Sequence, residues 1–172
     1  DILVFLDDDA IAVPDWLEQL CAGYSESNVM GVGGAIEPLW QAGRPAWFPT
    51  EFDWVVGCTY RGMPQTIAPV RNLIGCNMSL RRRVFDMVGG FRMGRVGALS
   101  VGQEDDETEL CIRAGKQWQG GVLLYNPLAR VLHHVPPNRA HWTYYRTRCY
   151  SEGWSKASMS RLVGYKDGLA SE

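Results

Sequence analysis

Hydrophobic residues along the chain form short continuous runs that alternate with stretches of helical spacing. Residues 2–6 are an unbroken apolar run, which predicts a strand buried on both faces of a mainly parallel sheet. After Pro14, apolar residues recur at helical spacing over residues 16–21, and Gly23 ends this predicted helix. Residues 29–36 predict a second strand, whose three glycines allow another backbone to approach closely.

Residues 38–72 interrupt this alternation. They contain five prolines and three tryptophans and show little periodicity. Such a pattern predicts a long, partly ordered loop, and loops of this length in a compact domain are typical of lids or binding segments.

The second half of the chain returns to alternating elements. We predict a strand over 72–80, a helix over 81–88, a glycine-rich link over 94–102, a helix over 104–116, strands over 122–125 and 130–134, and an aromatic, basic helical stretch over 139–162. Alternation of strands and helices predicts an α/β domain. We divide the chain into a partial catalytic domain, residues 1–137, and a C-terminal helical segment, residues 138–172.

Composition narrows the class of protein. The chain has 172 residues, of which 46% are hydrophobic, so it is one globular domain or a large part of one. A net charge of −2 argues against nucleic acid as a partner. Five cysteines without a CxxC pair predict reduced thiols in a cytoplasmic protein. No apolar stretch approaches the ~20 residues that cross a bilayer.

Three aspartates follow the first predicted strand directly. In open α/β sheets, ligands bind beyond the carboxyl ends of the strands. Side chains alternate along extended backbone, so Asp7 and Asp9 face the same way and Asp8 the other. Two carboxylates on one side suit Mg²⁺ or Mn²⁺. A solvated loop or a helix cap is the alternative interpretation.

A second acidic cluster lies at the start of a predicted helix. Its members are Glu104, Asp105, Asp106, Glu107 and Glu109. The helix macrodipole favours acids at this position, so capping explains part of the cluster. Mutual repulsion would also raise some pKa values toward the range of a general base. Both interpretations remain open.

Two further groups suggest ligand binding. His133 and His134 close a predicted strand, where imidazole acts either as a metal ligand or as an ordinary satisfied polar group. On the last predicted helix, Arg146, Arg148 and Lys156 are near enough in sequence to bind a diphosphate together. A solvated basic face is the alternative.

Four motifs, in this order, resemble the catalytic part of inverting family 2 glycosyltransferases, which have the GT-A fold. They are FLDDD, GCNMSLRRRVFDMVGGF, DETELCIRAG and ARVLHH. The resemblance runs through nearly the whole chain. It implies a GT-A-like α/β sheet with flanking helices, a nucleotide-sugar donor, and a carbohydrate or lipid-linked acceptor.

The resemblance also implies roles for particular residues. Asp7 and Asp9 would hold Mn²⁺ or Mg²⁺, with His133, or alternatively His134, as a further ligand. The residues implied on the donor and acceptor side are Asp8, Gly75, Asn77, Arg81, Arg146 and Arg148. Apart from the resemblance, Trp40, Trp47 and Trp54 either stack on acceptor sugars or are core or lid residues, and we prefer the second interpretation.

The same resemblance implies a carboxylate that deprotonates the acceptor hydroxyl. Counting back from the Leu-x-x-Arg part of the helix places the family's acidic pair on Asp106 and Glu107, with Glu107 as the base. Counting by identity instead selects Glu104 and Asp105, three residues earlier. We prefer Glu107, because spacing along a helix fixes where a side chain points.

One departure from the family concerns the N-terminal side. The family's upstream βαβ units recognise the base and ribose, and only six residues precede Asp7, so we expect the N-terminal nucleotide-binding half to be missing. The exposed sheet edge would then be covered by a second copy, by the missing segment or by a rearranged strand. We expect a cytoplasmic location, with the inner face of the membrane as the alternative for a full-length protein. The rival interpretations are a non-catalytic remnant or assembly module, and a metal-dependent phosphohydrolase.

Overall fold

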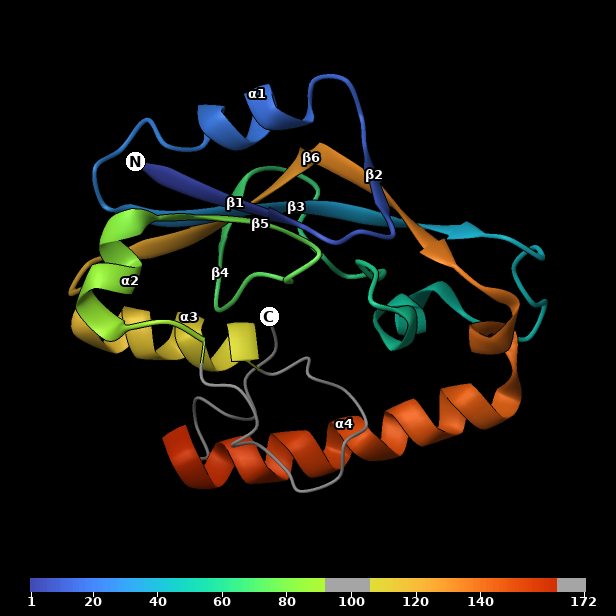
Figure 1. The fold of residues 1–172 in the computed structure, drawn as a ribbon. Coiled ribbons are helices and arrows are strands. Elements are labelled where there is room, and N and C mark those ends of the chain that lie inside the picture. Colours follow the sequence, from blue (N-terminus) through green and yellow to red (C-terminus); the bar gives the residue numbers. More distant parts are fainter. Residues whose placement is uncertain (92–105, 164–172) are drawn as a thin grey trace.

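The computed structural model describes residues 1–91 and 106–163. Its elements are β1 (Ile2–Leu6), β2 (Ala10–Ala12), α1 (Trp16–Ala22), β3 (Val29–Trp40), η1 (Thr50–Val56), β4 (Ala68–Val70), β5 (Asn77–Arg81), α2 (Arg82–Val88), α3 (Asp106–Gln117), β6 (Val122–Val135), η2 (Pro137–Ala140) and α4 (Trp142–Val163) (Figure 1). The predicted glycine-rich link lies outside the described residues.

The described strands form one mixed sheet in the order β1-β5-β3-β6-β2, with β4 paired to β6. Only β3 and β6 run parallel, and the other pairs are antiparallel. The prediction of a mainly parallel sheet was therefore wrong. The two short strands predicted around Pro127 are one bent strand, β6, whose pairing with β3 shifts register between Gly34 and Ile36.

Strand β1 lies at the edge of this sheet and pairs only with β5 among the described strands. Leu3, Val4 and Leu6 are exposed, so the prediction of a strand buried on both faces was also wrong. A continuous apolar run indicates a strand, but it does not say whether that strand is central or at an edge. Pairing of this edge with a second copy stays a prediction.

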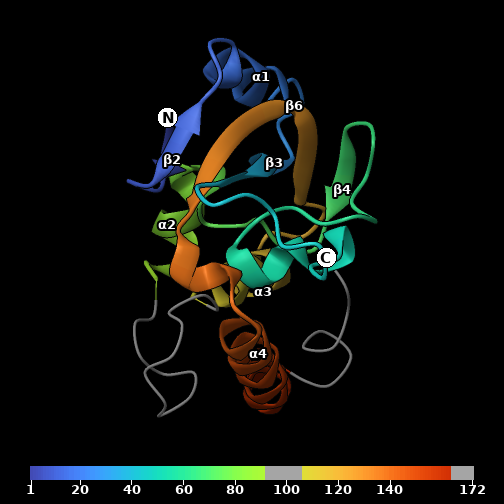
Figure 2. The ribbon, with the colours of Figure 1, turned by 90° about the vertical axis from the view of Figure 1, so that its right-hand side faces the viewer.

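Helices cover both faces of the sheet. In Figure 1, α1 lies above the sheet, and α2 and α3 lie below it. Figure 2 shows α1 and α3 on opposite sides of the strands, with α4 further from the sheet. The core under α2 and α3 contains Met78, Leu80, Val84, Leu110 and Leu123.

Helix α4 joins the rest of the molecule through aromatic rings. The ring centroid of Tyr145 lies 5.4 Å from those of Phe48 and Phe52, and it stacks on Trp142 at 5.2 Å. The division of the chain after residue 137 falls at the start of η2 and stays a prediction. Among the described helices, none is long and apolar enough to cross a membrane.

The start of β5 is fixed by the buried side chain of Asn77. Its Nδ2 donates hydrogen bonds to the carbonyls of Ala35, at 3.0 Å, and Ala129, at 2.8 Å. Its Oδ1 accepts a hydrogen bond of 2.8 Å from the indole Nε1 of Trp16. One amide therefore ties together β3, β6 and the helix on the upper face.

We expect Asn77→Ala to lower the free energy of unfolding by about 3 kcal/mol, because it leaves buried carbonyls and an indole N–H unpaired. Asn28→Ala is the control, since Asn28 is exposed and donates one bond of 3.2 Å to the Gly120 carbonyl. Its loss should stay within about 0.5 kcal/mol. Urea unfolding measures both. Equal losses in the two variants would contradict the structural role of Asn77.

Candidate metal and catalytic site

The turn after β1 carries the aspartates toward β6. The backbone N–H of Ala10 donates to the carbonyl of Asp7 at 3.1 Å, which closes the turn. Strand β2 then pairs with β6, with Ala10 opposite His133. The N–H of His134 donates to the Asp9 carbonyl at 2.9 Å, so the turn and the end of β6 are joined directly.

This pairing brings acidic and imidazole groups together. The Nε2 atom of His133 lies 3.2 Å from Oδ1 of Asp9. One ligand atom each from Asp7, Cys76 and His133 also lie within 4.8 Å of one another. Loss of solvation, and then the charge of Asp9, raise the pKa of Asp7. The charges of Asp7 and Asp9 thus repel each other, and a bound cation would offset this repulsion.

His133 is buried and turned toward the acids. Burial lowers the pKa of its imidazole, although the charge of Asp9 acts in the opposite direction. Burial therefore favours the neutral ring, which is the form that binds metals. His134 points to the opposite face of β6, because side chains alternate along a strand. The structure thus places His133, and not His134, beside the aspartates.

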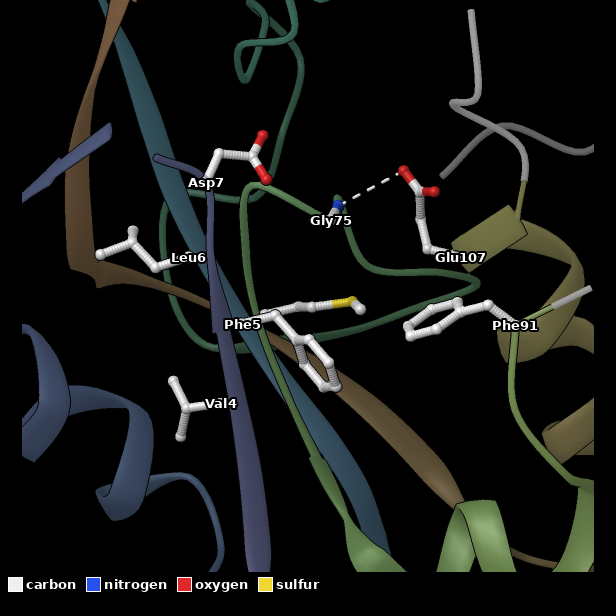
Figure 3. A pocket seen from close by; sticks show the side chains of 8 residues that line it. Val4, Phe5, Leu6, Asp7, Gly75, Phe91 and Glu107 are labelled. Carbon is white, nitrogen blue, oxygen red and sulfur yellow. Dashed lines mark hydrogen bonds between the residues drawn. The ribbon is translucent and has the colours of Figure 1, made fainter. Parts of the chain in front are cut away.

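A pocket of about 340 Å³ adjoins this cluster. It is lined by Val4, Phe5, Leu6, Asp7, Gly75, Met78, Phe91 and Glu107. Figure 3 shows the carboxylates of Asp7 and Glu107 on opposite sides of Gly75. The N–H of Gly75 donates to Oε1 of Glu107 at 3.4 Å. Glu107 lies in the first turn of α3. The end of β1 and the start of α3 therefore line the same pocket.

The structure does not describe the side chains of the other acids considered as the general base. Glu104 and Asp105 lie outside the described residues, and for Asp106 only the backbone, at the start of α3, is described. Asp8 is exposed in the turn between the two aspartates that face the cluster.

Two residues predicted to contact donor or acceptor make structural hydrogen bonds within the fold. Asn77 is buried in the hydrogen bonds described above. Arg81 pairs with Ile2 in the sheet, five residues before Asp7, which places it roughly 17 Å along the strand from the first aspartate. Its guanidinium donates to the carbonyls of Val29, Tyr24 and Glu26, so it anchors the loop after α1.

The predicted aromatic and basic contacts lie in η1, in the loop just before it and in α4. Trp47 is exposed and packs against Trp142 and Tyr145, while Trp54 is half-buried beside Phe52. Arg148 is buried, whereas Arg146 is exposed. Residues two apart on a helix do not face each other, so these two arginines do not form one diphosphate clamp.

The sequence analysis did not predict two residues that lie near the cluster. Cys76 is one of its three grouped donors, and burial together with the charges of Asp7 and Asp9 raises its pKa to about 12. Arg139, from η2, is close enough to lower the pKa of His133. Cys76 could have been predicted only from the register of the sheet. Leu6 pairs with Asn77 in the antiparallel pair of β1 and β5, so the residues that follow Leu6 and precede Asn77, Asp7 and Cys76, lie opposite each other.

Comparison with solved structures defines the class of fold. The crystal structure of GalNAc-T7 with UDP, GalNAc and Mn²⁺ matches 95% of this chain and 35% of that one, with a TM-score of 0.52 and 17% identity. The chain therefore has the GT-A-like glycosyltransferase fold, as its motifs predicted.

A curated relative is more similar in sequence than this solved structure. The chain is 39% identical over 165 residues to the glucosyl-dolichyl phosphate glucuronosyltransferase of Haloferax volcanii. The match covers 94% of this chain and 52% of the relative, so the chain spans about half the length of the curated protein it matches. No family model matches the chain. This homologue is named as a glycosyltransferase, which agrees with the resemblance to glycosyltransferases that the motifs predicted.

Proposed function

We propose that the chain carries the catalytic centre of a metal-dependent, inverting glycosyltransferase. In this proposal a sugar passes from a nucleotide diphosphate to an acceptor hydroxyl. The observation that carries it is the shared pocket, with Asp7 and the His133 cluster on one side and Glu107 on the other. The homologous glucuronosyltransferase and the GT-A-like fold support the same class of reaction.

The donor atoms of the cluster fit a divalent cation. Asp7 and Asp9 provide carboxylate oxygens, and His133 provides a neutral imidazole nitrogen. Mn²⁺ accepts both kinds of ligand, and Mg²⁺ prefers the oxygens. When bound, such a cation would neutralise charge on the leaving nucleotide diphosphate. The GalNAc-T7 crystal contains Mn²⁺ and UDP, which supports this choice.

Glu107 is the proposed general base. Its carboxylate would take the proton of the acceptor hydroxyl while the oxygen attacks the anomeric carbon from the side opposite the leaving group. This direction of attack inverts the configuration at that carbon. The hydrogen bond from the Gly75 N–H holds Oε1 toward the pocket.

We propose UDP-linked glucuronate as the donor to test first, and a lipid-linked glucoside as acceptor. The relative is named a glucosyl-dolichyl phosphate glucuronosyltransferase, which supports a glucuronosyl donor and a lipid-linked glucoside as acceptor. The exposed face of α4 suits a lipid-linked substrate, because Trp142, Tyr150 and Trp154 are 59%, 72% and 51% exposed. Arg146 lies on the same face. Aromatic and basic side chains of this kind favour the interface of a membrane.

We expect the double variant Trp142→Ala, Trp154→Ala to bind anionic lipid vesicles at least about tenfold more weakly, since binding scales with the apolar area that enters the interface. Leu128→Ala is the control, because Leu128 is 58% exposed on β6, away from α4. Co-sedimentation with vesicles measures the partition. Binding by the double variant equal to that of the control would contradict a membrane-facing α4.

The metal dependence of nucleotide binding is tested by calorimetry of the full-length protein with UDP. We expect UDP to bind in the presence of Mn²⁺ and at least about tenfold more weakly in EDTA, because the diphosphate and the acids of the site repel each other without a cation. Equal affinity in both conditions would contradict the metal-dependent part of the proposal. Release of phosphate from the nucleotide sugar without any sugar transfer would favour a phosphohydrolase.

A further inference from the structure

A thiol takes part in the cluster that faces the pocket. The Sγ of Cys76 belongs to the group of ligand atoms, with those of Asp7 and His133, that lie within 4.8 Å of one another. Cys76 and His133 are 5% and 4% exposed, so both are held inside the fold rather than on a mobile surface. Sulfur, nitrogen and oxygen donors therefore converge on one point at the end of β1.

Sheet pairing fixes the thiol in this position. Cys76 immediately precedes β5, and the pairing of Leu6 with Asn77 sets that strand against β1. The amide of Asn77 is in turn bound to β3 and β6. Neither Cys76 nor Asp7 can shift along the strands without breaking these contacts. The two donors are thus preorganised relative to each other.

The orientation of His133 is fixed from its other side. Its Nδ1 lies 3.6 Å from the Sγ of Cys58, and the imidazole is hydrogen bonded to the backbone of Val56. Nε2 then faces Asp9 at 3.2 Å. A hydrogen bond to one ring nitrogen is how metal-binding histidines are usually oriented. Cys58 therefore supports the ring, while Cys76 lies among the donors.

We propose that Cys76 is a ligand of the divalent cation in this site, together with Asp7 and His133. This inference rests on the metal site of the proposed function and extends it to the kind of cation. Coordination forms a bond between the cation and the Cys76 sulfur, and the thiol proton passes to solvent. A sulfur ligand favours Co²⁺, Zn²⁺ or Cd²⁺ over Mg²⁺. We expect these cations to displace Mg²⁺.

The experiment is a titration of the full-length protein with Co²⁺ alone, under reducing conditions, followed by absorption. A cobalt–thiolate bond gives a near-ultraviolet charge-transfer band, whereas oxygen and nitrogen ligands do not. We expect the wild-type protein to show this band and Cys76→Ser to lose it. In Cys76→Asp, Co²⁺ should still bind without the band, which shows that the site itself is intact. Cys111→Ser should keep it, because Cys111 lies in the core outside the cluster.

A band that persists in Cys76→Ser, or Co²⁺ binding by the wild type without any band, would overturn the inference. Absence of Co²⁺ binding would overturn both this inference and the metal site. Near-ultraviolet circular dichroism of each variant shows whether its fold is retained. The readout does not depend on catalysis. If the protein shows the band but transfers no sugar, Cys76 is still a metal ligand, and the proposed function is refuted.

Discussion

Replacing Glu107 with glutamine should lower the rate of sugar transfer by about 10²–10⁴-fold, the usual contribution of a general base. The amide keeps the size of the side chain and can still accept the hydrogen bond from Gly75, but it cannot take a proton from the acceptor. Binding of Mn²⁺ and UDP should be unchanged, because the acids of the metal cluster are untouched. Initial rates of transfer and calorimetry measure the two effects separately.

The control variants are Glu104→Gln and Asp105→Asn, the two acids selected by motif identity instead of spacing. Each should retain most of the activity if Glu107 is the base. A loss of activity in either variant that exceeds the loss in Glu107→Gln would move the base three residues toward the N-terminus.

Replacement of His133 by alanine should weaken Mn²⁺ binding at least about tenfold and should lower metal-dependent UDP binding with it. The reason is that His133 faces Asp9 at 3.2 Å and lies in the ligand group with Asp7. Manganese binding can be followed by electron paramagnetic resonance, since free Mn²⁺ and bound Mn²⁺ give different signals.

The neighbouring His134→Ala provides a matched control. Its side chain lies on the opposite face of the same strand, so Mn²⁺ binding should not change. Equal losses in the two histidine variants would contradict the assignment, and a loss confined to His134→Ala would reverse it.

Local signals in the sequence predicted the helices of the first half well. The helix predicted to end at Gly23 is α1, Trp16–Ala22, and the helix predicted over 81–88 is α2, Arg82–Val88. In both cases apolar spacing marks the helix and a glycine follows its last turn, at Gly23 and Gly89. These features depend on neighbouring residues only.

Sheet order and strand direction could not be predicted in the same way. The chain places β1 beside β5, although about seventy residues separate them, and only β3 and β6 run parallel. An apolar run carries no information about its partner strand. For this reason the edge position of β1 and the bent course of β6 were found only in the structure.

The same distinction applies to the site. Asp7, Asp9 and Glu107 were predicted from motifs that are continuous in the sequence. Cys76 was missed because its place beside Asp7 follows from the register between two strands. Asn77 was placed on the donor and acceptor side because its segment, GCNMSLRRRVFDMVGGF, resembles the family's, and the structure shows that its amide hydrogen bonds join β3 and β6.

Analysis of the transferred sugar by nuclear magnetic resonance tests the central claim most directly. The full-length protein is incubated with UDP-linked glucuronate, a lipid-linked glucoside and Mn²⁺. The account predicts a new glycoside whose anomeric configuration is opposite to that of the donor, formed only when the cation is present and at least about a hundredfold more slowly by Glu107→Gln. A product with the donor's configuration, or transfer at an unchanged rate in EDTA, would contradict the account.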